Sequence, residues 1–381
     1  MTTYSDLGIR RVINAAATLT RLGGSRMPRP VLEAMVAAAG AFVDLDALQQ
    51  RVGSRIAELT HNPACYVSSG AAAGVALAVA ACIAGDDPAA RAQFPRLESG
   101  KNEVIVHRCQ RNGYDYAIRQ TGARLVEIGL AQRTELWELE AAITPRTAAV
   151  VYFAGAHFAQ GALPLEQTIA AAHAQAMPVI VDAAAQIPPI ANLWRFTRDM
   201  GADIAIFSGG KGLRGPQSAG LVLGRPDLIA ACQLNGSPNY SIGRPMKVGK
   251  EELMGMLAAV EWSLAQDEAA LLDQYETMVE YWLSGLRDLP GIQVSRGYPS
   301  EAGQPHARAI VRLEPAGGAT RDELVSALLR GDPAVAVGVV GGDAIALNPQ
   351  TVEPGEEHLV LEALRQALAK PLAHRRNVSE G

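Results

Sequence analysis

Short runs of apolar residues alternate with amphipathic stretches through most of this chain. The apolar runs lie at residues 65–67, 103–107, 124–128, 148–153, 178–182, 204–207 and 219–223. Helical spacing of apolar positions predicts helices between several of them, near 114–121, 135–143 and 165–176. Apolar strands that alternate with helices are typical of the α/β class, in which a mostly parallel sheet is covered by helices on both faces.

The same pattern divides the chain into four parts. Residues 1–27 indicate an irregular N-terminal arm, after which prolines mark the first turn of a helix. The strand and helix alternation over 28–250 predicts a large domain, and 251–289 predicts one or two long connecting helices. Short strands and helices over 290–381 predict a smaller α+β domain.

The stretch ADIAIFSGGKGLRGPQSAGLVLG, residues 202–224, carries the most informative chemistry. Lys211 directly follows an apolar strand, although a buried cation is costly. The glycines on either side of the lysine are interpreted as leaving room for a flat group near the backbone. An amine in this setting suits a Schiff base with a cofactor aldehyde such as pyridoxal phosphate (PLP). The alternative is a solvated turn lysine, the usual state of lysine in such loops.

A dinucleotide site is the other chemistry that this stretch suggests. Residues 210–215 spell GKGLRG, which matches the GxGxxG pattern. That pattern must open a helix, whereas Pro216 and an apolar run follow here. We therefore reject a dinucleotide site, and the lack of Ser or Thr after the lysine excludes a P-loop.

Further residues at strand ends support a PLP site. Ser69 precedes an alanine-rich helix, whose free N–H groups suit a phosphate, although a plain helix cap is an alternative. Asp182 ends the PVIV strand, where a carboxylate needs a cation such as a protonated pyridine nitrogen; again a helix cap is the alternative. Ala184 is small enough to lie under a flat ring. Ser208, three residues before Lys211, adds a phosphate hydrogen bond.

Composition narrows the class of protein. The 381 residues are 49% hydrophobic and 19% charged, as in an ordinary soluble enzyme, and the net charge of −5 argues against a nucleic-acid partner. The four cysteines are far apart with no zinc spacing, which favours reduced thiols and no metal site. Neither a secretory signal nor a membrane span is apparent. We expect a cytoplasmic enzyme that acts on a small molecule.

These motifs resemble fold type I PLP enzymes, in particular the branch of selenocysteine synthase (L-seryl-tRNA(Sec) selenium transferase) and D-glucosaminate-6-phosphate ammonia-lyase. The resembling blocks are RRVINAA (10–16), SSGAAAG (68–74), PVIVDAAAQ (178–186), SGGKGLRGPQSAG (208–220), IGRPMKVGKEE (242–252) and LNPQTVEPGEE (347–357). The resemblance implies PLP held at Lys211 and Asp182 at the pyridine nitrogen. The phosphate contacts that it implies are Ser69, Gly70, Ala71 and Ser208.

Departures from the branch favour a small substrate. The tRNA-using members carry an N-terminal domain before the RRVIN segment, whereas this chain begins almost at that segment. They also have a leucine-glycine-glycine run where this chain has Leu213, Arg214 and Gly215. The AIALNPQ region lacks the arginine with which aminotransferases of this fold bind the α-carboxylate, which disfavours transamination.

Candidate substrate-binding residues are basic. Arg244, Lys247 and Lys250 form a cation cluster, for which a solvated helix face is the alternative. The resemblance favours anion binding by Arg244 and Lys247. Arg214 is a similar candidate. Thr20 lies in the arm that we expect to close over the site.

The end of the 103–107 strand is also expected to face the cofactor. Gln110 or Arg111 follows the 103–107 strand and is expected over the cofactor ring, with the choice between them open. His107 ends the same strand, and a structural histidine is favoured over a catalytic one.

The leading hypothesis is a PLP-dependent lyase of the ammonia-lyase type that eliminates water and ammonia from an anionic amino acid or amino-sugar acid and leaves a keto acid. An amino-acid racemase or epimerase and a selenium-transferase-like β-replacement enzyme are the alternatives that use the same cofactor. A binding protein on an inactive PLP scaffold is the non-enzymatic alternative. The fold also favours a homodimer or a higher homo-oligomer.

Overall fold

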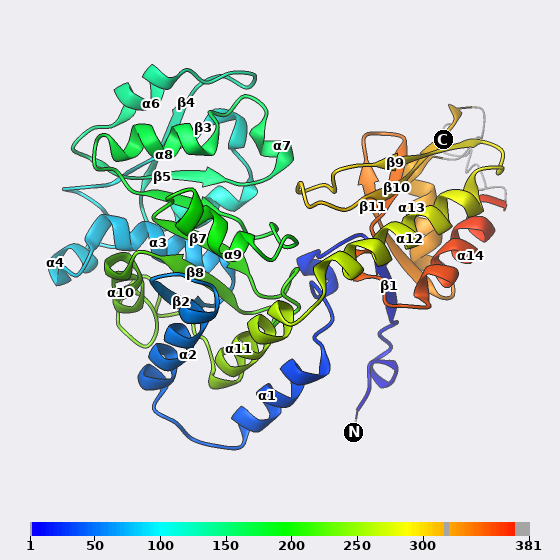
Figure 1. Ribbon diagram of the computed structural model, residues 1–381, viewed down its shortest axis with the longest axis horizontal. Helices are drawn as coiled ribbons and strands as arrows, with labels where there is room; N and C mark the ends of the chain where they lie inside the picture. The colour runs from blue at the N-terminus through cyan, green and yellow to red at the C-terminus, as the bar shows by residue number, and fades with distance from the viewer. Residues whose placement is uncertain (1, 316–319, 370–381) are drawn as a thin grey trace, which may run out of the picture. The chain divides into compact units, whose positions relative to one another are not determined.

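The computed structural model describes residues 2–315 and 320–369 and has two compact units (Figure 1). The large unit spans Gly23–Gln266 and Glu301–Gln304; the small unit spans the remaining segments, 1–22, 267–300 and 305–381. The expected connecting segment 251–289 consists of two helices, α11 (Lys250–Leu264) in the large unit and α12 (Glu268–Leu286) in the small unit. Residues 301–304 fall within the expected small domain, yet they belong to the large unit.

The large unit is built on a seven-stranded sheet of order β2-β8-β7-β6-β5-β3-β4. The strands are β2 (Ala64–Ser68), β3 (Glu103–His107), β4 (Arg124–Ile128), β5 (Thr147–Phe153), β6 (Val179–Asp182), β7 (Ile204–Ser208) and β8 (Gly220–Gly224). Only β8 runs antiparallel to its neighbours, β2 and β7. The predicted α/β class and mostly parallel sheet are confirmed. The carboxyl ends of six strands therefore meet at one edge of the sheet.

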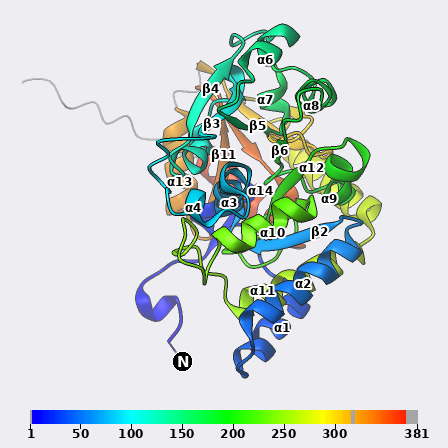
Figure 2. The ribbon, with the colours of Figure 1, turned by 90° about the vertical axis from the view of Figure 1, so that its left-hand side faces the viewer.

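Helices pack against this sheet and against one another. Those of the large unit are α1 (Arg29–Ala39), α2 (Leu45–Leu59), α3 (Ala71–Ala84), α4 (Pro88–Arg91), α5 (Tyr116–Arg119), α6 (Leu136–Ala142), α7 (Ala156–Ala159), α8 (Leu165–His173), α9 (Asn192–Trp194), α10 (Pro226–Asn235) and α11. Figure 2 shows α1, α2 and α11 side by side, in agreement with their extensive contacts. The helix expected near 114–121 is shorter, because a 3₁₀ turn (Gly113–Asp115) precedes α5.

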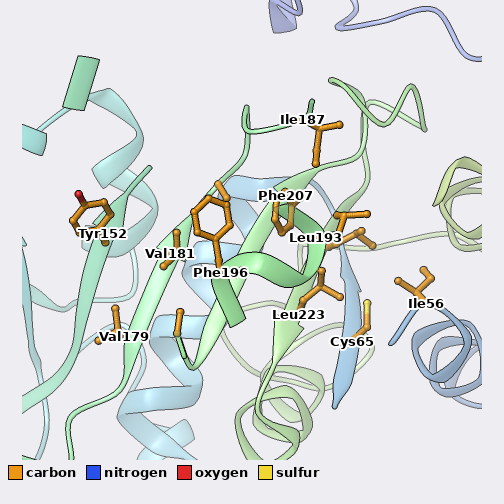
Figure 3. Close-up of a cluster of buried hydrophobic side chains, with 14 of the residues drawn as sticks. Ile56, Cys65, Tyr152, Val179, Val181, Ile187, Leu193, Phe196, Phe207 and Leu223 are labelled. Carbon is orange, nitrogen blue, oxygen red and sulfur yellow. The ribbon is translucent and has the colours of Figure 1, made fainter. Parts of the chain in front are cut away.

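Two hydrophobic cores lie on opposite faces of the sheet. Along β5, Val150 and Tyr152 belong to one core, whereas Val151 and Phe153 belong to the other. This alternation is the period of a strand whose two faces are both covered. Figure 3 shows part of the first core, where Phe207 lies among side chains from several strands and from the segment after β6.

The small unit has a five-stranded sheet of order β1-β11-β12-β10-β9. Its elements are β1 (Val12–Ala15), β9 (Ile292–Gly297), β10 (Arg308–Leu313), β11 (Ala334–Val340), β12 (Ala344–Leu347), α12, α13 (Arg321–Arg330) and α14 (Glu356–Ala369). The expectation of an irregular arm is wrong for β1, which pairs in parallel with β11. Only four residues pair, too few for periodicity to reveal a strand.

A search of the helices within 2–315 and 320–369 finds none long and apolar enough to cross a membrane.

Candidate functional site

A closed loop between β7 and β8 carries Lys211. The N–H of Gly209 donates to the Ala219 carbonyl (2.8 Å), and the N–H of Gly215 donates back to the Gly209 carbonyl (2.8 Å). At the tip of the loop, the Arg214 N–H donates to the Lys211 carbonyl (3.0 Å), with Arg214 in the left-handed region at φ 52°. These bonds fix the main chain of Lys211 beyond the carboxyl end of β7.

The glycines next to Lys211 serve the packing of the loop itself. A Cβ at Gly210 would lie 2.5 Å from the Cα of Gln217, and one at Gly212 would lie 2.2 Å from the Ile187 carbonyl oxygen. Main-chain atoms cannot approach a Cβ that closely. This packing accounts for glycine at both positions. That the two glycines also leave room for a flat ligand stays a prediction.

Ser25 holds the Lys211 main chain from a distant part of the sequence. Its Oγ lies 3.0 Å from the Gly210 carbonyl oxygen and 2.8 Å from that of Lys211. Gly24 makes the approach possible, because a Cβ there would lie 2.2 Å from the Gly210 oxygen. Sequence patterning gave no sign of this contact.

Replacing Ser25 with alanine should lower the free energy of unfolding by about 1 kcal/mol, the usual net worth of one hydrogen bond. It should also weaken PLP retention, since the Lys211 main chain loses its hydroxyl partner. Urea unfolding and PLP titration measure both effects. Ser218→Ala, at an exposed position of the same loop, is the matched control. Equal behaviour of the two variants would contradict the assigned role.

Asp182 and Lys211 both lie at the carboxyl edge of the sheet, where the charge of each influences the pKa of the other. Asp182 ends β6, and its Oδ1 accepts from the Ala184 N–H (3.0 Å). Burial raises the pKa of Asp182, and the Ala184 N–H and the Lys211 charge oppose that rise. Burial lowers the pKa of the Lys211 amine, and the charges of Asp182 and Glu301 oppose that fall. Each group is thus shifted toward its neutral form.

The Asp182 carboxylate and the Lys211 amine fit PLP. Among the described residues, Asp182 accepts a single hydrogen bond and has no ion-pair partner, so its carboxylate can accept the proton-bearing nitrogen of a pyridine ring. Over the same ranges the Lys211 Nζ makes no hydrogen bond or ion pair, and it lies 6.0 Å from the centre of the Tyr114 ring. An amine held in this way is available for a cofactor aldehyde.

The Ser69 turn and Ser208 lie at the same edge. The register places Ser68 and Ser208 on either side of Gly220. A Cβ at Gly220 would lie 2.7 Å from the Gly70 carbonyl carbon and 2.8 Å from the Ala71 nitrogen, so only glycine lets the turn lie on β8.

The N-terminus of α3 begins at that turn. Gly70 precedes the helix at φ 89°, no side chain caps it, and a Cβ at Gly70 would meet nothing within 4 Å. Ser69 and Ala71 are half-buried beside it. Open N–H groups at a helix start suit a phosphate. Ala184 joins the neighbouring strand end, because its carbonyl accepts from the Ser208 N–H (3.4 Å).

The two residues expected over the cofactor ring are held by neighbouring groups. Gln110 is fully buried, and its Oε1 accepts from the N–H of Phe153 (3.1 Å), which fixes it to β5. Arg111 pairs with Asp115 (2.6 Å) and with Glu127. Phe153 pairs with Asp182 in the register of β5 and β6, so Gln110 is bonded to a strand next to that of Asp182. Which of the two residues lies over the cofactor ring stays open.

Tyr114 is a residue near Lys211 that the sequence did not suggest. Its ring, 63% exposed, is the aromatic group beside the Lys211 amine. Sequence reasoning missed Tyr114 because it lies in a 3₁₀ turn, where no strand or helix period applies. The one available signal is the two tyrosines, Tyr114 and Tyr116, of the NGYDY segment shortly after β3.

Arg214 ties the lysine loop to two neighbouring segments. Its Nε donates to the Arg26 carbonyl (2.8 Å), and its guanidinium lies 5.6 Å from the centre of the Trp262 ring. We therefore assign Arg214 to the support of the loop and leave it out of the proposed substrate site.

For Arg244 and Lys247, no hydrogen bond or ion pair with Lys211 is found within the described ranges. Arg244 is half-buried and Lys247 exposed in the loop after α10, and neither pairs with a carboxylate in the part of the chain described. Thr20 is exposed at the start of a 3₁₀ turn (Thr20–Leu22) in the small unit. Their roles stay predictions.

His107 is buried and neutral. Burial lowers its pKa to about 4, and its ring meets that of Tyr152 edge-on at 5.6 Å. This placement agrees with a structural histidine. Within residues 2–315 and 320–369, no group of three His, Cys, Asp or Glu side chains could hold a metal ion.

Comparison with known proteins identifies the family. Residues 102–346 match the family described as aminotransferase class-V. The chain belongs to this family. It is 34% identical over 376 residues to a Streptomyces 5'-C-glycyluridine monooxygenase-decarboxylase, covering 96% of this chain and 92% of that protein. It is 33% identical to the D-glucosaminate-6-phosphate ammonia lyase of Salmonella typhimurium strain 14028s, covering 95% and 97%.

A solved structure agrees with this relationship. The structure of D-glucosaminate-6-phosphate ammonia-lyase has a TM-score of 0.83 and 33% identity, covering 97% of this chain and 99% of that one. The predicted resemblance to the ammonia-lyase and selenocysteine synthase branch is confirmed. This chain is an enzyme of fold type I, and its cofactor is PLP.

Proposed function

We propose that this enzyme is a PLP-dependent ammonia-lyase that acts on an anionic amino-sugar acid or a similar small amino acid and yields a keto acid. The observation that carries the proposal is the placement of Asp182 and Lys211 at one sheet edge. Burial raises the pKa of this carboxyl and lowers the pKa of this amine, so both are shifted toward their neutral forms. The full-length similarity to D-glucosaminate-6-phosphate ammonia lyase supports the type of reaction.

PLP, when bound, supplies an electron sink for charge that develops at the substrate Cα. The Lys211 Nζ takes the Cα proton, a task that its lowered pKa favours because the amine is more readily neutral. The same Nζ then delivers a proton to the leaving β-hydroxyl oxygen. The Asp182 carboxylate would hold the proton of the ring nitrogen.

The substrate's anionic group needs a cation that has no other partner. Arg244 and Lys247 meet this condition, since neither pairs with a carboxylate within the described segments. We propose that they bind this group. Phosphate contacts from Ser69, Gly70, Ala71 and Ser208 would leave these cations free for the substrate.

A second function has specific support. The Streptomyces relative, at 34% identity, is named for monooxygenase and decarboxylase activity on 5'-C-glycyluridine. An oxidative decarboxylation of a glycyl-nucleoside is therefore the competing proposal, and it shares the cofactor site.

A substrate panel tests the two proposals against each other. The holoenzyme is incubated with amino-sugar acids, their phosphates, small hydroxy amino acids and a glycyl-nucleoside. We expect ammonia and a keto acid in equal amounts, without O₂ uptake. Uptake of O₂ with CO₂ release would replace the lyase proposal, and label from deuterated water at Cα without keto acid would replace it with a racemase.

We also propose a cytoplasmic homodimer or higher homo-oligomer. The four cysteines, Cys65, Cys82, Cys109 and Cys232, are free thiols, which suits a reducing compartment. Light scattering of the purified holoenzyme tests the assembly, and a monomeric mass would contradict it.

A further inference from the structure

The turn that follows Asp182, residues 183–186, carries the N–H group that orients the Asp182 carboxylate. The Ala184 N–H donates to the Asp182 Oδ1 (3.0 Å). The turn is closed by a bond from the Gln186 N–H to the Ala183 carbonyl (2.9 Å). Any shift of the turn therefore moves the donor on which the orientation of the carboxylate depends.

Two carbonyls of this turn accept hydrogen bonds from other segments of the chain. The Ala184 carbonyl accepts from the Ser208 N–H (3.4 Å), at the end of β7. The next carbonyl, that of Ala185, accepts from the Gln304 Nε2 (2.8 Å), a side chain 119 positions later in the sequence. The turn is thus held by β7 at one residue and by Gln304 at the next.

Gln304 belongs to a strap, residues 301–304, that is itself held by hydrogen bonds. Ala302 and Gln304 are buried, with 7% and 3% of their surface exposed. The Ala302 carbonyl accepts from the Gln186 Nε2 (2.8 Å) and from the Ala156 N–H (3.4 Å). These bonds fix the main chain from which the Gln304 side chain reaches the turn.

The amide of Gln304 is committed to the Ala185 bond. Its Oε1 is buried and accepts no hydrogen bond from the residues that the structure describes. A buried, unpaired amide oxygen costs free energy that an apolar side chain would avoid. The contribution of the amide at this position is therefore the bond that its Nε2 donates to the turn.

We propose that Gln304 is a positioning residue for Asp182: through the Ala185 carbonyl it holds the turn whose Ala184 N–H fixes the carboxylate that is to bind the ring nitrogen of PLP. Gln304 acts through the turn and touches neither cofactor nor substrate. The inference rests on the role that the proposed function gives to Asp182.

A double-mutant cycle in the full-length chain tests this proposal, with the Kd of PLP as the readout. Gln304→Met keeps the length of the side chain and removes the donor. Alone, it should raise the Kd roughly threefold to tenfold, the usual effect of one hydrogen bond. Asp182→Asn should raise the Kd roughly tenfold or more. Adding Gln304→Met to Asp182→Asn should then change the Kd by less than about twofold, because the carboxylate on which Gln304 acts is gone.

Nitrogen-15 NMR of PLP labelled at its ring nitrogen gives a readout that a general loss of stability would not move. The chemical shift reports whether this nitrogen carries a proton. At pH 8 the signal of Gln304→Met should lie between those of the wild type and Asp182→Asn.

Gln175→Met is the matched control. Gln175 is an exposed glutamine of the same unit whose Nε2 also donates to a distant carbonyl, that of Glu140 (3.2 Å). Its replacement should leave both the Kd and the NMR signal at their wild-type values. If Gln304→Met melts too low for study, Gln304→Asn keeps the amide but shortens its reach and serves in the same comparison.

Two results would overturn the role of Gln304 alone: an equal change of Kd in both backgrounds, or a wild-type NMR signal in Gln304→Met. Wild-type affinity of Asp182→Asn for PLP would instead refute the ring-nitrogen role of Asp182, and this inference with it. No substrate is used, so failure of the lyase proposal leaves every one of these results readable.

Discussion

Replacing Lys211 with alanine is expected to abolish covalent PLP attachment and to reduce turnover by roughly 10³-fold or more. The Lys211 Nζ has no hydrogen-bond or ion-pair partner among the described residues, so no neighbouring group shares its task. Loss of the amine removes both the covalent anchor and the proposed Cα base. Borohydride reduction followed by peptide mass spectrometry detects the attachment, and ammonia release measures turnover.

Two further variants sharpen this prediction. Lys211→Arg keeps the charge but cannot form a Schiff base, and it should fail in the same way. Lys101→Ala, at an exposed lysine of the same unit, should behave like the wild type. PLP attached covalently to Lys211→Ala after reduction would show that another amine holds the cofactor.

The sequence was sufficient for the parts of the site that follow strands. Ser69, Asp182 and Lys211 each come after an apolar run, and parallel strands bring such ends to one edge. The register confirms the nearness of the Ser69 turn and Ser208, because Gly220 lies between their strands. Local pattern and topology together therefore gave the position of these groups, whereas their roles stay predictions.

The residues that sequence reasoning missed come from loops. Ser25 and Tyr114 reach the Lys211 segment from parts of the chain without a strand or helix period, through contacts that depend on the folded chain. The packing role of the glycines beside Lys211 was missed for the same reason. Gly212 is explained by its distance to Ile187, and nothing in the local sequence shows that the two meet.

Replacing Asp182 with asparagine is expected to lower activity by about 10²-fold or more and, at the same time, to stabilise the PLP-free chain. Asparagine can still accept the Ala184 N–H through its oxygen, so the local fold is kept. It carries no charge to hold a ring-nitrogen proton, and activity falls. Ammonia release by the holoenzyme measures this loss.

The stability gain follows from the sign of the pKa shift. Burial raises the pKa of Asp182 in the folded chain, so the folded state favours the neutral acid and ionisation at higher pH costs stability. Below the unfolded pKa of about 3.9 the cost is absent, and above the raised folded pKa it is complete. The variant should therefore melt higher than the wild type at pH 7, by about 2 °C or more, with a smaller difference toward acid pH.

Lys211 opposes part of this gain, because its ammonium loses an attractive partner in Asp182→Asn. Burial is the larger influence on the carboxyl, so the net change stays stabilising. Asp86→Asn, at an exposed position of the large unit, is the control and should leave both activity and melting unchanged. A PLP-free Asp182→Asn chain that melts below the wild type at pH 7 would mean that the carboxylate stabilises the fold. Its place at the sheet edge would then need no cofactor to explain it.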